Sequence, residues 1–116
     1  MPPPADFLPL SPHQFHILLA LTSRDRHGYG IIQDVERHSA GSLRLGTGTL
    51  YTAIARLVEH GLIAGTGRTD DRRKYYRLTT LGRAVLRAET TRLDALVRHA
   101  RAHGVRPDAP LLPRRS

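Results

Sequence analysis

Apolar residues recur at helical spacing in four stretches of the chain. In the third stretch, Leu50, Ile54, Leu57 and Val58 fall at positions i, i+4, i+7 and i+8, which places them on one face of a helix. The first stretch is apolar on more than one face, so we expect that helix to be buried on two sides. The pattern predicts helices over about 12–21, 29–39, 49–60 and 80–103.

Alternating apolar and polar residues predict short strands between these helices. Residues 43–45 alternate and could form a very short strand. After the third helix, residues 62–63 begin a strand, residues 65–72 form a turn-rich tip, and residues 73–78 return as a second strand. The last two strands therefore predict a β-hairpin.

Several residues mark where the helices begin and end. Ser11 and Gln14 have the spacing of a capping box at the start of the first helix. Gly41, Gly61 and Gly104 follow the next three helices, at positions where a left-handed residue commonly ends a helix. In the second helix, the polar residues expected to point outward are Gln33, Asp34, Glu36 and Arg37.

The order of elements predicts one mainly α-helical domain with a small β-hairpin. Three helices, a hairpin and a long helix, with a short glycine-containing connection before the third helix, fit a winged helix-turn-helix followed by a dimerisation helix. We expect a disordered tail over 1–9, the winged helix-turn-helix over 10–78, the dimerisation helix over 79–103 and a second disordered tail over 104–116.

Composition points to a polyanionic partner. The 116 residues carry a formal net charge of +8 and the sequence pI is about 11.2. Cysteine is absent, so disulfides and thiolate chemistry are excluded. No apolar run approaches about 18 residues, and the N-terminus lacks a secretory signal pattern, so we expect a cytoplasmic protein without a membrane partner.

The third helix carries the residue types that read DNA. With its apolar stripe turned inward, Thr49, Thr52 and Arg56 point outward and Tyr51 lies on the flank. Threonines at a helix start can approach phosphates or base edges, and arginine can bind a guanine edge with two hydrogen bonds. Tyr51 can donate to a phosphate or pack on a thymine methyl group. Each could instead be an ordinary surface side chain.

The hairpin tip is strongly cationic. In a winged helix such a loop lies along the neighbouring minor groove and contacts phosphates, although a merely solvated charged hairpin is the alternative. Two acidic residues, Asp70 and Asp71, offset the cations only in part. The cationic residues are Arg68, Arg72, Arg73 and Lys74.

The last helix carries an apolar stripe too wide for one small domain to cover. Pairing with the first helix of a second copy, through Phe15 and Leu19, would bury it. A two-fold dimer would place two recognition helices about 34–36 Å apart, which matches a palindromic site. Packing within one chain is the alternative. The stripe and its neighbours comprise Leu81, Val85, Leu86, Ala88, Leu93, Leu96, Val97 and Ala100.

Enzymatic and metal-binding functions find little support in the residues. His13 and His16, or His99 and His103, could share a helix face, but neither pair has an adjacent carboxylate or cysteine. No glycine run forms a phosphate loop, and no serine or histidine sits in a nucleophile setting. We therefore expect no catalysis, no metal and no cofactor.

Four runs together form a specific joint motif. They read His-Gly-Tyr-Gly-Ile (27–31), Gly-Thr-Leu-Tyr (48–51), Ile-Ala-Arg-Leu-Val-Glu-His-Gly-Leu-Ile (54–63) and Arg-Arg-Lys-Tyr-Tyr-Arg-Leu-Thr-Thr-Leu-Gly-Arg (72–83). Over about residues 9–102 the chain resembles the PadR family of bacterial transcriptional regulators. The short C-terminal region is similar to that of the smaller PadR subgroup, and the absence of tryptophan rules out the stacked-indole drug pocket of some members.

The resemblance implies a winged helix-turn-helix protein that binds DNA as a homodimer, usually as a repressor. By the same resemblance, the DNA contacts fall on Thr47, Thr49 and Tyr51 in the recognition helix region and on Arg72, Arg73 and Lys74 in the wing.

A small hydrophobic or aromatic effector, if one acts, would bind between the dimer halves, where Phe15 is a candidate lining residue. Two other functions stay open: a sequence-tolerant nucleic-acid-binding module, and a winged-helix protein–protein adaptor.

Overall fold

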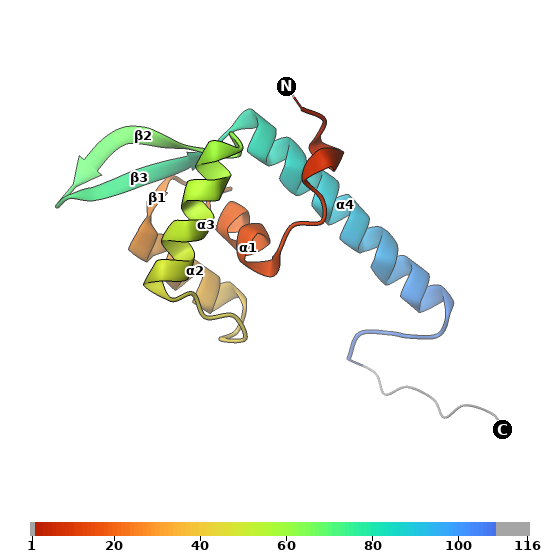
Figure 1. Cartoon of the computed structure of the whole chain (residues 1–116). Coiled ribbons are helices and arrows are strands. Elements are labelled where there is room, and N and C mark those ends of the chain that lie inside the picture. The colour runs from red at the N-terminus through yellow and green to blue at the C-terminus, as the bar shows by residue number, and fades with distance from the viewer. Residues whose placement is uncertain (1, 109–116) are drawn as a thin grey trace.

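The computed structural model describes residues 2–108, which form five helices and three short strands (Figure 1). The mainly helical winged helix-turn-helix fold with a small sheet and a long final helix is confirmed. In chain order the elements are a 3₁₀ helix (Pro4–Phe7), α1 (Pro12–Ala20), β1 (Arg26–His27), α2 (Gly28–His38), α3 (Thr47–Glu59), β2 (Ile63–Asp70), β3 (Arg73–Leu78) and α4 (Thr80–Ala102).

The hydrophobic core lies among α1, α2, α3 and the first turns of α4. The start of α1 forms as predicted, because the Ser11 hydroxyl accepts from the Gln14 N–H and the Gln14 side chain accepts from the Ser11 N–H, both at 3.1 Å. The largest fully buried apolar side chains are Ile17, Leu18, Leu21, Ile31, Val35, Leu50, Leu57, Leu62, Ile63 and Val85.

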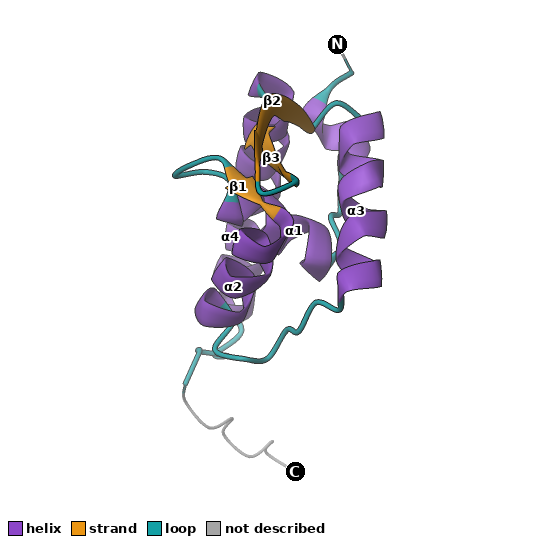
Figure 2. Cartoon of the chain, turned by 90° about the vertical axis from the view of Figure 1, so that its left-hand side faces the viewer, coloured by secondary structure: helices purple, strands orange, loops and turns teal. Residues whose placement is uncertain are grey.

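One member of the predicted apolar stripe of α3 does not reach the core. Leu50, Ile54 and Leu57 are buried, but Val58 is 42% exposed. Val58 follows Leu50 by eight residues, which rotate the helix by about 80° more than two full turns. Val58 therefore lies on the flank of the helix and not directly above Leu50. Viewed from the side of the hairpin (Figure 2), α3 forms one side of the molecule and leaves its outer face uncovered.

The sheet differs from the prediction in three ways. Residues 43–45 have no regular structure, whereas Arg26–His27, which lie outside the predicted strands, form β1 and pair with Tyr75 and Tyr76 of β3. The strand order is β1-β3-β2. Most of the expected tip is strand, since β2 continues to Asp70. The turn consists of Asp71 and Arg72, whose positive φ values of 49° and 66° are typical of a two-residue hairpin turn.

The position of β1 is supported by a carboxylate that was expected to face solvent. Asp34 of α2 is buried, and its Oδ1 lies 3.1 Å from Nη2 of Arg26. The Arg26 Nε also donates to the carbonyl of Ala20 at 2.6 Å, and His38 Nδ1 lies 3.3 Å from Asp34 Oδ2. The outward prediction for Asp34 was wrong because helical spacing alone does not show a cation on another element.

Helix α4 begins directly after the hairpin and is held there by its cap. The Thr79 hydroxyl accepts from the Gly82 N–H at 2.9 Å, and its single proton is shared between the carbonyl oxygens of Gly61, at 2.6 Å, and Leu62, at 2.9 Å. With 23 residues, α4 is about 34 Å long. Gly104, with φ 82°, follows its end as predicted. No helix within residues 2–108 is both long and apolar enough to cross a bilayer.

The first turns of α4 belong to the core of their own protomer. Leu81, Val85 and Leu86 are buried among α1, β2 and β3 residues, with Val85 fully inaccessible. Their assignment to a dimer interface is therefore wrong, since a buried side chain leaves no surface for a second copy. Further along α4 the apolar residues emerge, so that Leu96 is 53% and Val97 43% exposed.

The N-terminal segment is not the disordered tail that was expected over 1–9. Pro4–Phe7 form a 3₁₀ helix packed against α4, and Phe7 lies with its ring centroid 5.9 Å from that of His60. The backbone N–H of Leu10 donates to Glu89 Oε2 of α4 at 2.7 Å. These contacts supply the tertiary partners that a proline-rich composition does not reveal. Of the expected C-terminal tail over 104–116, residues 109–116 lie outside the described residues.

Glu89 is the buried anchor of this segment. The Arg92 side chain donates to both carboxylate oxygens of Glu89. These hydrogen bonds, together with the one from Leu10, hold the pKa of Glu89 below its ordinary value, although burial acts in the opposite direction. The folded state therefore favours the ionised carboxylate of Glu89. The resulting stabilisation is fully present above the unfolded pKa of about 4.3, and it is lost as the pH falls through the lower pKa of the folded state.

Glu89→Gln is expected to lower the free energy of unfolding by about 1–3 kcal/mol at pH 7, because the charge-assisted hydrogen bonds are lost while the shape is kept. The difference from the unchanged protein should shrink below about pH 4, measured by urea unfolding at several pH values. Glu36→Gln, on the exposed face of α2, is the matched control and should leave stability nearly unchanged. A gap that stays constant down to pH 3 would contradict the assigned role of the Glu89 carboxylate.

Candidate nucleic-acid interface

The outer face of α3 begins at a helix terminus that no side chain caps. Gly46 is the N-cap residue and makes no side-chain hydrogen bond, so the first N–H groups of α3 stay open to an outside acceptor. The predicted contact residues of this helix, Thr47, Thr49, Tyr51, Thr52 and Arg56, are all exposed. The surface around the start of α3 is therefore accessible to a ligand.

The exposed residues of α3 divide between two flanks of the helix. Thr49, Thr52 and Arg56 follow one another at i, i+3 and i+7 and line an open groove of about 620 Å³ between α3 and the start of α1. The opposite flank carries Tyr51, which faces the hairpin. The sequence did not indicate the contribution of α1, whose residues in the groove are Ser11, His13 and Gln14.

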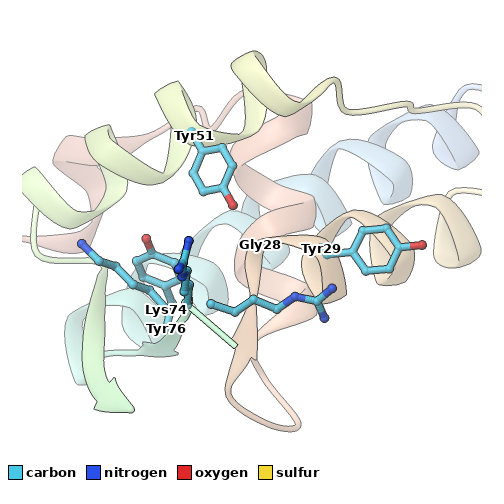
Figure 3. Close-up of a pocket in the computed structure, with 7 residues that line it drawn as sticks. Gly28, Tyr29, Tyr51, Lys74 and Tyr76 are labelled. Carbon is cyan, nitrogen blue, oxygen red and sulfur yellow. The ribbon is translucent and has the colours of Figure 1, made fainter. Parts of the chain in front are cut away.

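A second hollow joins α3 to the hairpin (Figure 3). It has a volume of about 250 Å³ and is lined by Gly28, Tyr29, Tyr51, Arg72, Arg73, Lys74 and Tyr76. Tyr51 of α3 points its hydroxyl toward Gly28 at the start of α2, whereas the ring of Tyr29 points away. The structure thus brings Tyr51 together with three of the four predicted wing cations.

Gly28 makes room for the Tyr51 ring. A Cβ atom at position 28 would lie 2.7 Å from the Tyr51 hydroxyl oxygen, so any larger residue would displace this side chain. Tyr76, across the hollow, is partly buried against the core. Burial, and to a lesser degree the neighbouring Tyr51, raise the pKa of Tyr76. The sequence analysis did not identify Gly28, Tyr29 and Tyr76 as residues that line this hollow, because the hollow forms only when α2, α3 and β3 pack together.

The cations of the wing differ in their partners. Arg68 lies 3.9 Å from Asp70 and stacks over the ring of Tyr75 at 4.0 Å from its centroid, so it is partly satisfied within the hairpin. Within residues 2–108, no carboxylate oxygen lies within 4.0 Å of the charged groups of Arg72, Arg73 or Lys74. These three exposed cations beside Tyr51 form a surface that favours phosphate.

Comparison with known families identifies the chain. Residues 17–88, more than half of it, match the model of the transcriptional regulator PadR-like family. The chain belongs to this family. This membership makes it a DNA-binding transcriptional regulator, and the exposed outer face of α3 and the neighbouring cationic hairpin are consistent with that function. Transcriptional regulators are a class whose members are generally not enzymes.

The chain is also similar to several solved structures and to one curated relative. A transcriptional regulator from Clostridium thermocellum is 26% identical, with a TM-score of 0.69 over 78% of this chain and 87% of its own. RosR of H. salinarum is 28% identical, with a TM-score of 0.65 over 85% and 92%. A PadR family regulator from Clostridium difficile, at 23% identity, shares the fold, with a TM-score of 0.70 over 82% and 100%. A protein of Lysinibacillus sphaericus without an assigned function is 38% identical over 60% of this chain and 67% of its own.

Proposed function

We propose that this PadR-like protein is a repressor that binds a palindromic operator as a homodimer and is released by a small-molecule effector. The observation that carries the proposal is the shared hollow between α3 and the wing, where Tyr51 lies beside Arg72, Arg73 and Lys74. A base-reading helix and a phosphate-binding hairpin on one face can bind adjacent grooves of the same duplex. Placement in the smaller PadR subgroup is part of this proposal.

The exposed end of α4 supports the homodimer. Leu96 and Val97 are exposed on the half of α4 that extends away from the body of the molecule (Figure 1). Leu93, Ala88 and Ala100 are half-buried, and Leu19 on α1 is 37% exposed. Together these residues offer an apolar surface that a second copy would bury. Phe15 packs against the core of its own chain and would contribute only its remaining exposed area.

A groove between α1 and α4 supports binding of a small hydrophobic or aromatic effector. It has a volume of about 320 Å³. Because Thr79 alone separates β3 from α4, a displacement of α4 would be transmitted to the wing. Phe15, the candidate lining residue, does not line this groove. The lining residues are Leu19, Thr22, Leu78, Arg83, Leu86, Arg87, Thr90 and Thr91.

Footprinting together with sedimentation tests the proposal. A dimeric repressor should protect a short palindrome, bind it far more tightly than random duplex at physiological salt, and sediment as a dimer at micromolar concentration. Equal affinity for every duplex would indicate a sequence-tolerant module instead. The absence of any salt-dependent DNA binding would indicate a protein–protein adaptor. Transcription from the protected promoter should rise when the gene for this protein is removed, and a fall would indicate an activator.

Tyr51→Ala is expected to weaken binding to the operator about tenfold or more and binding to random duplex much less, because Tyr51 is proposed to contact bases as well as backbone. The measurement is fluorescence anisotropy with both duplexes at the same salt concentration. Equal losses on the two duplexes would show that Tyr51 contacts only the backbone. Since Tyr51 is exposed, the variant should unfold at the same urea concentration as the unchanged protein.

A further inference from the structure

His27 lies at the point where the sheet meets α2 and the wing. It ends β1, and its ring nitrogen Nδ1 accepts from the backbone N–H of Gly30 at 3.0 Å, which caps α2. The ring packs edge-on against Tyr75, its cross-strand neighbour, with ring centroids 5.2 Å apart. Two elements therefore fix the orientation of this ring.

The capping bond determines which ring nitrogen of His27 carries the proton. A neutral imidazole that accepts at Nδ1 has its hydrogen on Nε2. The opposite tautomer would place two donors against each other at Gly30, where the helix backbone cannot move away. His27 Nε2 is therefore a donor, and the capping role requires the neutral ring.

This donor meets a second donor and no acceptor. Nε2 of His27 lies 3.3 Å from Nη1 of Arg73, and a guanidinium nitrogen can only donate. The contact is therefore not a hydrogen bond between the two residues. Arg73 is also held near the ring of Tyr29, at 5.6 Å from its centroid, and no carboxylate of residues 2–108 lies within 4.0 Å of its guanidinium. An anionic oxygen beside the two nitrogens, about 2.9 Å from each, would accept from both N–H groups.

We propose that His27 and Arg73 bind one oxygen of a DNA backbone phosphate between them. The site takes a phosphate oxygen, and we assign it to the duplex because Arg73 also lines the hollow that contains Tyr51 and Lys74. The inference rests on the DNA-binding function proposed above. His27 contributes a neutral hydrogen bond, whereas Arg73 contributes a charge, and this difference makes the two roles separable by experiment.

The test compares His27→Asn with Arg73→Gln. Asparagine at the N-cap position keeps an acceptor for the first turn of α2, but its shorter side chain cannot extend a donor to the proposed phosphate oxygen beside Arg73. His27→Asn is expected to weaken binding to duplex DNA about tenfold and to leave the dependence of log K on log salt unchanged, because no cation is lost. Arg73→Gln should weaken binding and also reduce the salt slope, by about 0.9 for each phosphate contact. Thermal unfolding of both variants should match that of the unchanged protein.

Nitrogen NMR of the histidine rings in the unchanged protein gives a readout that does not depend on a variant. The Nε2–H signal of His27, identified by its absence in His27→Asn, should report the Nδ1-acceptor tautomer and should shift when duplex DNA is added. Inorganic phosphate at the same phosphate concentration should shift the signal much less. An equal shift with inorganic phosphate would indicate a free-anion site and overturn the assignment to DNA.

The outcomes separate this inference from the proposed function. If the unchanged protein binds its operator and His27→Asn binds equally well, the phosphate site is wrong and the repressor proposal stands. If the His27 ring carries its proton on Nδ1 instead, Nε2 cannot donate to a phosphate oxygen, and the phosphate site is again wrong while the repressor proposal stands. If the unchanged protein binds no DNA, both the proposed function and the phosphate site fail.

Discussion

Gly82→Ala is expected to lower the free energy of unfolding by about 3–5 kcal/mol, a large part of the stability of a domain of this size. An added Cβ would lie 2.0 Å from the carbonyl oxygen of Leu62 and 2.8 Å from Cδ1 of Leu78. That carbonyl also accepts from the N–H of Thr79 at 3.1 Å and shares the Thr79 hydroxyl proton, at 2.9 Å, with the carbonyl of Gly61. It cannot withdraw without breaking the contacts that attach α4 to the hairpin. Urea unfolding followed by circular dichroism measures the loss.

Gly48→Ala provides the matched control. Gly48 also lies in the first turn of a helix, but apart from its own helix backbone and chain neighbours no atom of residues 2–108 stands within 4 Å of the Cβ that alanine would add. Because alanine restricts the unfolded chain, this variant should leave stability unchanged or raise it by up to about 1 kcal/mol. If the two variants lost stability equally, helix propensity would be responsible, and the close approach of α4 to β2 would not be a constraint on the fold.

The helices could be predicted because their signals are local. Leu50, Ile54 and Leu57 show the spacing of a buried face, and Ser11 with Gln14 forms a cap from residues three apart. These features depend on the chain within one or two turns, so the sequence contains all the information that they need. The boundaries of α2, α3 and α4 accordingly fall within about two residues of the expected ones.

The remaining features depend on residues distant in sequence. The two residues of β1 are too few to show alternation, and they become a strand because β3 pairs with them and Arg26 is held by Asp34. The segment that follows the 3₁₀ helix is bound to α4 through Leu10 and Glu89, which are 79 residues apart along the chain. Neither interaction leaves a periodic signal that composition or spacing could reveal.

The candidate site was predictable as a set of residues but not as a geometry. Exposure of Thr49, Thr52 and Arg56 follows from the buried stripe of α3. The division of α3 into one flank facing α1 and another facing the wing could not be read from the sequence, because it requires the direction of the hairpin. For the same reason, sequence alone did not show that Tyr51 lies beside the wing cations.

Neutralising the wing is expected to have the largest effect on DNA binding. The triple variant Arg72→Asn, Arg73→Gln, Lys74→Gln removes three cations that have no carboxylate partner within residues 2–108. Asparagine is chosen at position 72 because it tolerates the positive φ of the turn. In a dimer six phosphate contacts are lost, which should weaken binding about a thousandfold at physiological salt and reduce the salt slope by about five. Fluorescence anisotropy at several salt concentrations measures both quantities.

The control for this variant removes the same charge far from the wing. The control variant combines Arg98→Gln, Arg101→Gln and Arg106→Gln. These residues lie at or beyond the distal end of α4, on the opposite side of the molecule from the hairpin (Figure 1). If binding depended on net charge alone, the two triple variants would lose equal affinity. A wing that binds specific phosphates instead predicts a small loss for the distal variant and an unchanged salt slope, because counterions are released only where cations contact phosphates. The wing variant should keep its urea midpoint, since its three side chains are exposed and contribute little to stability.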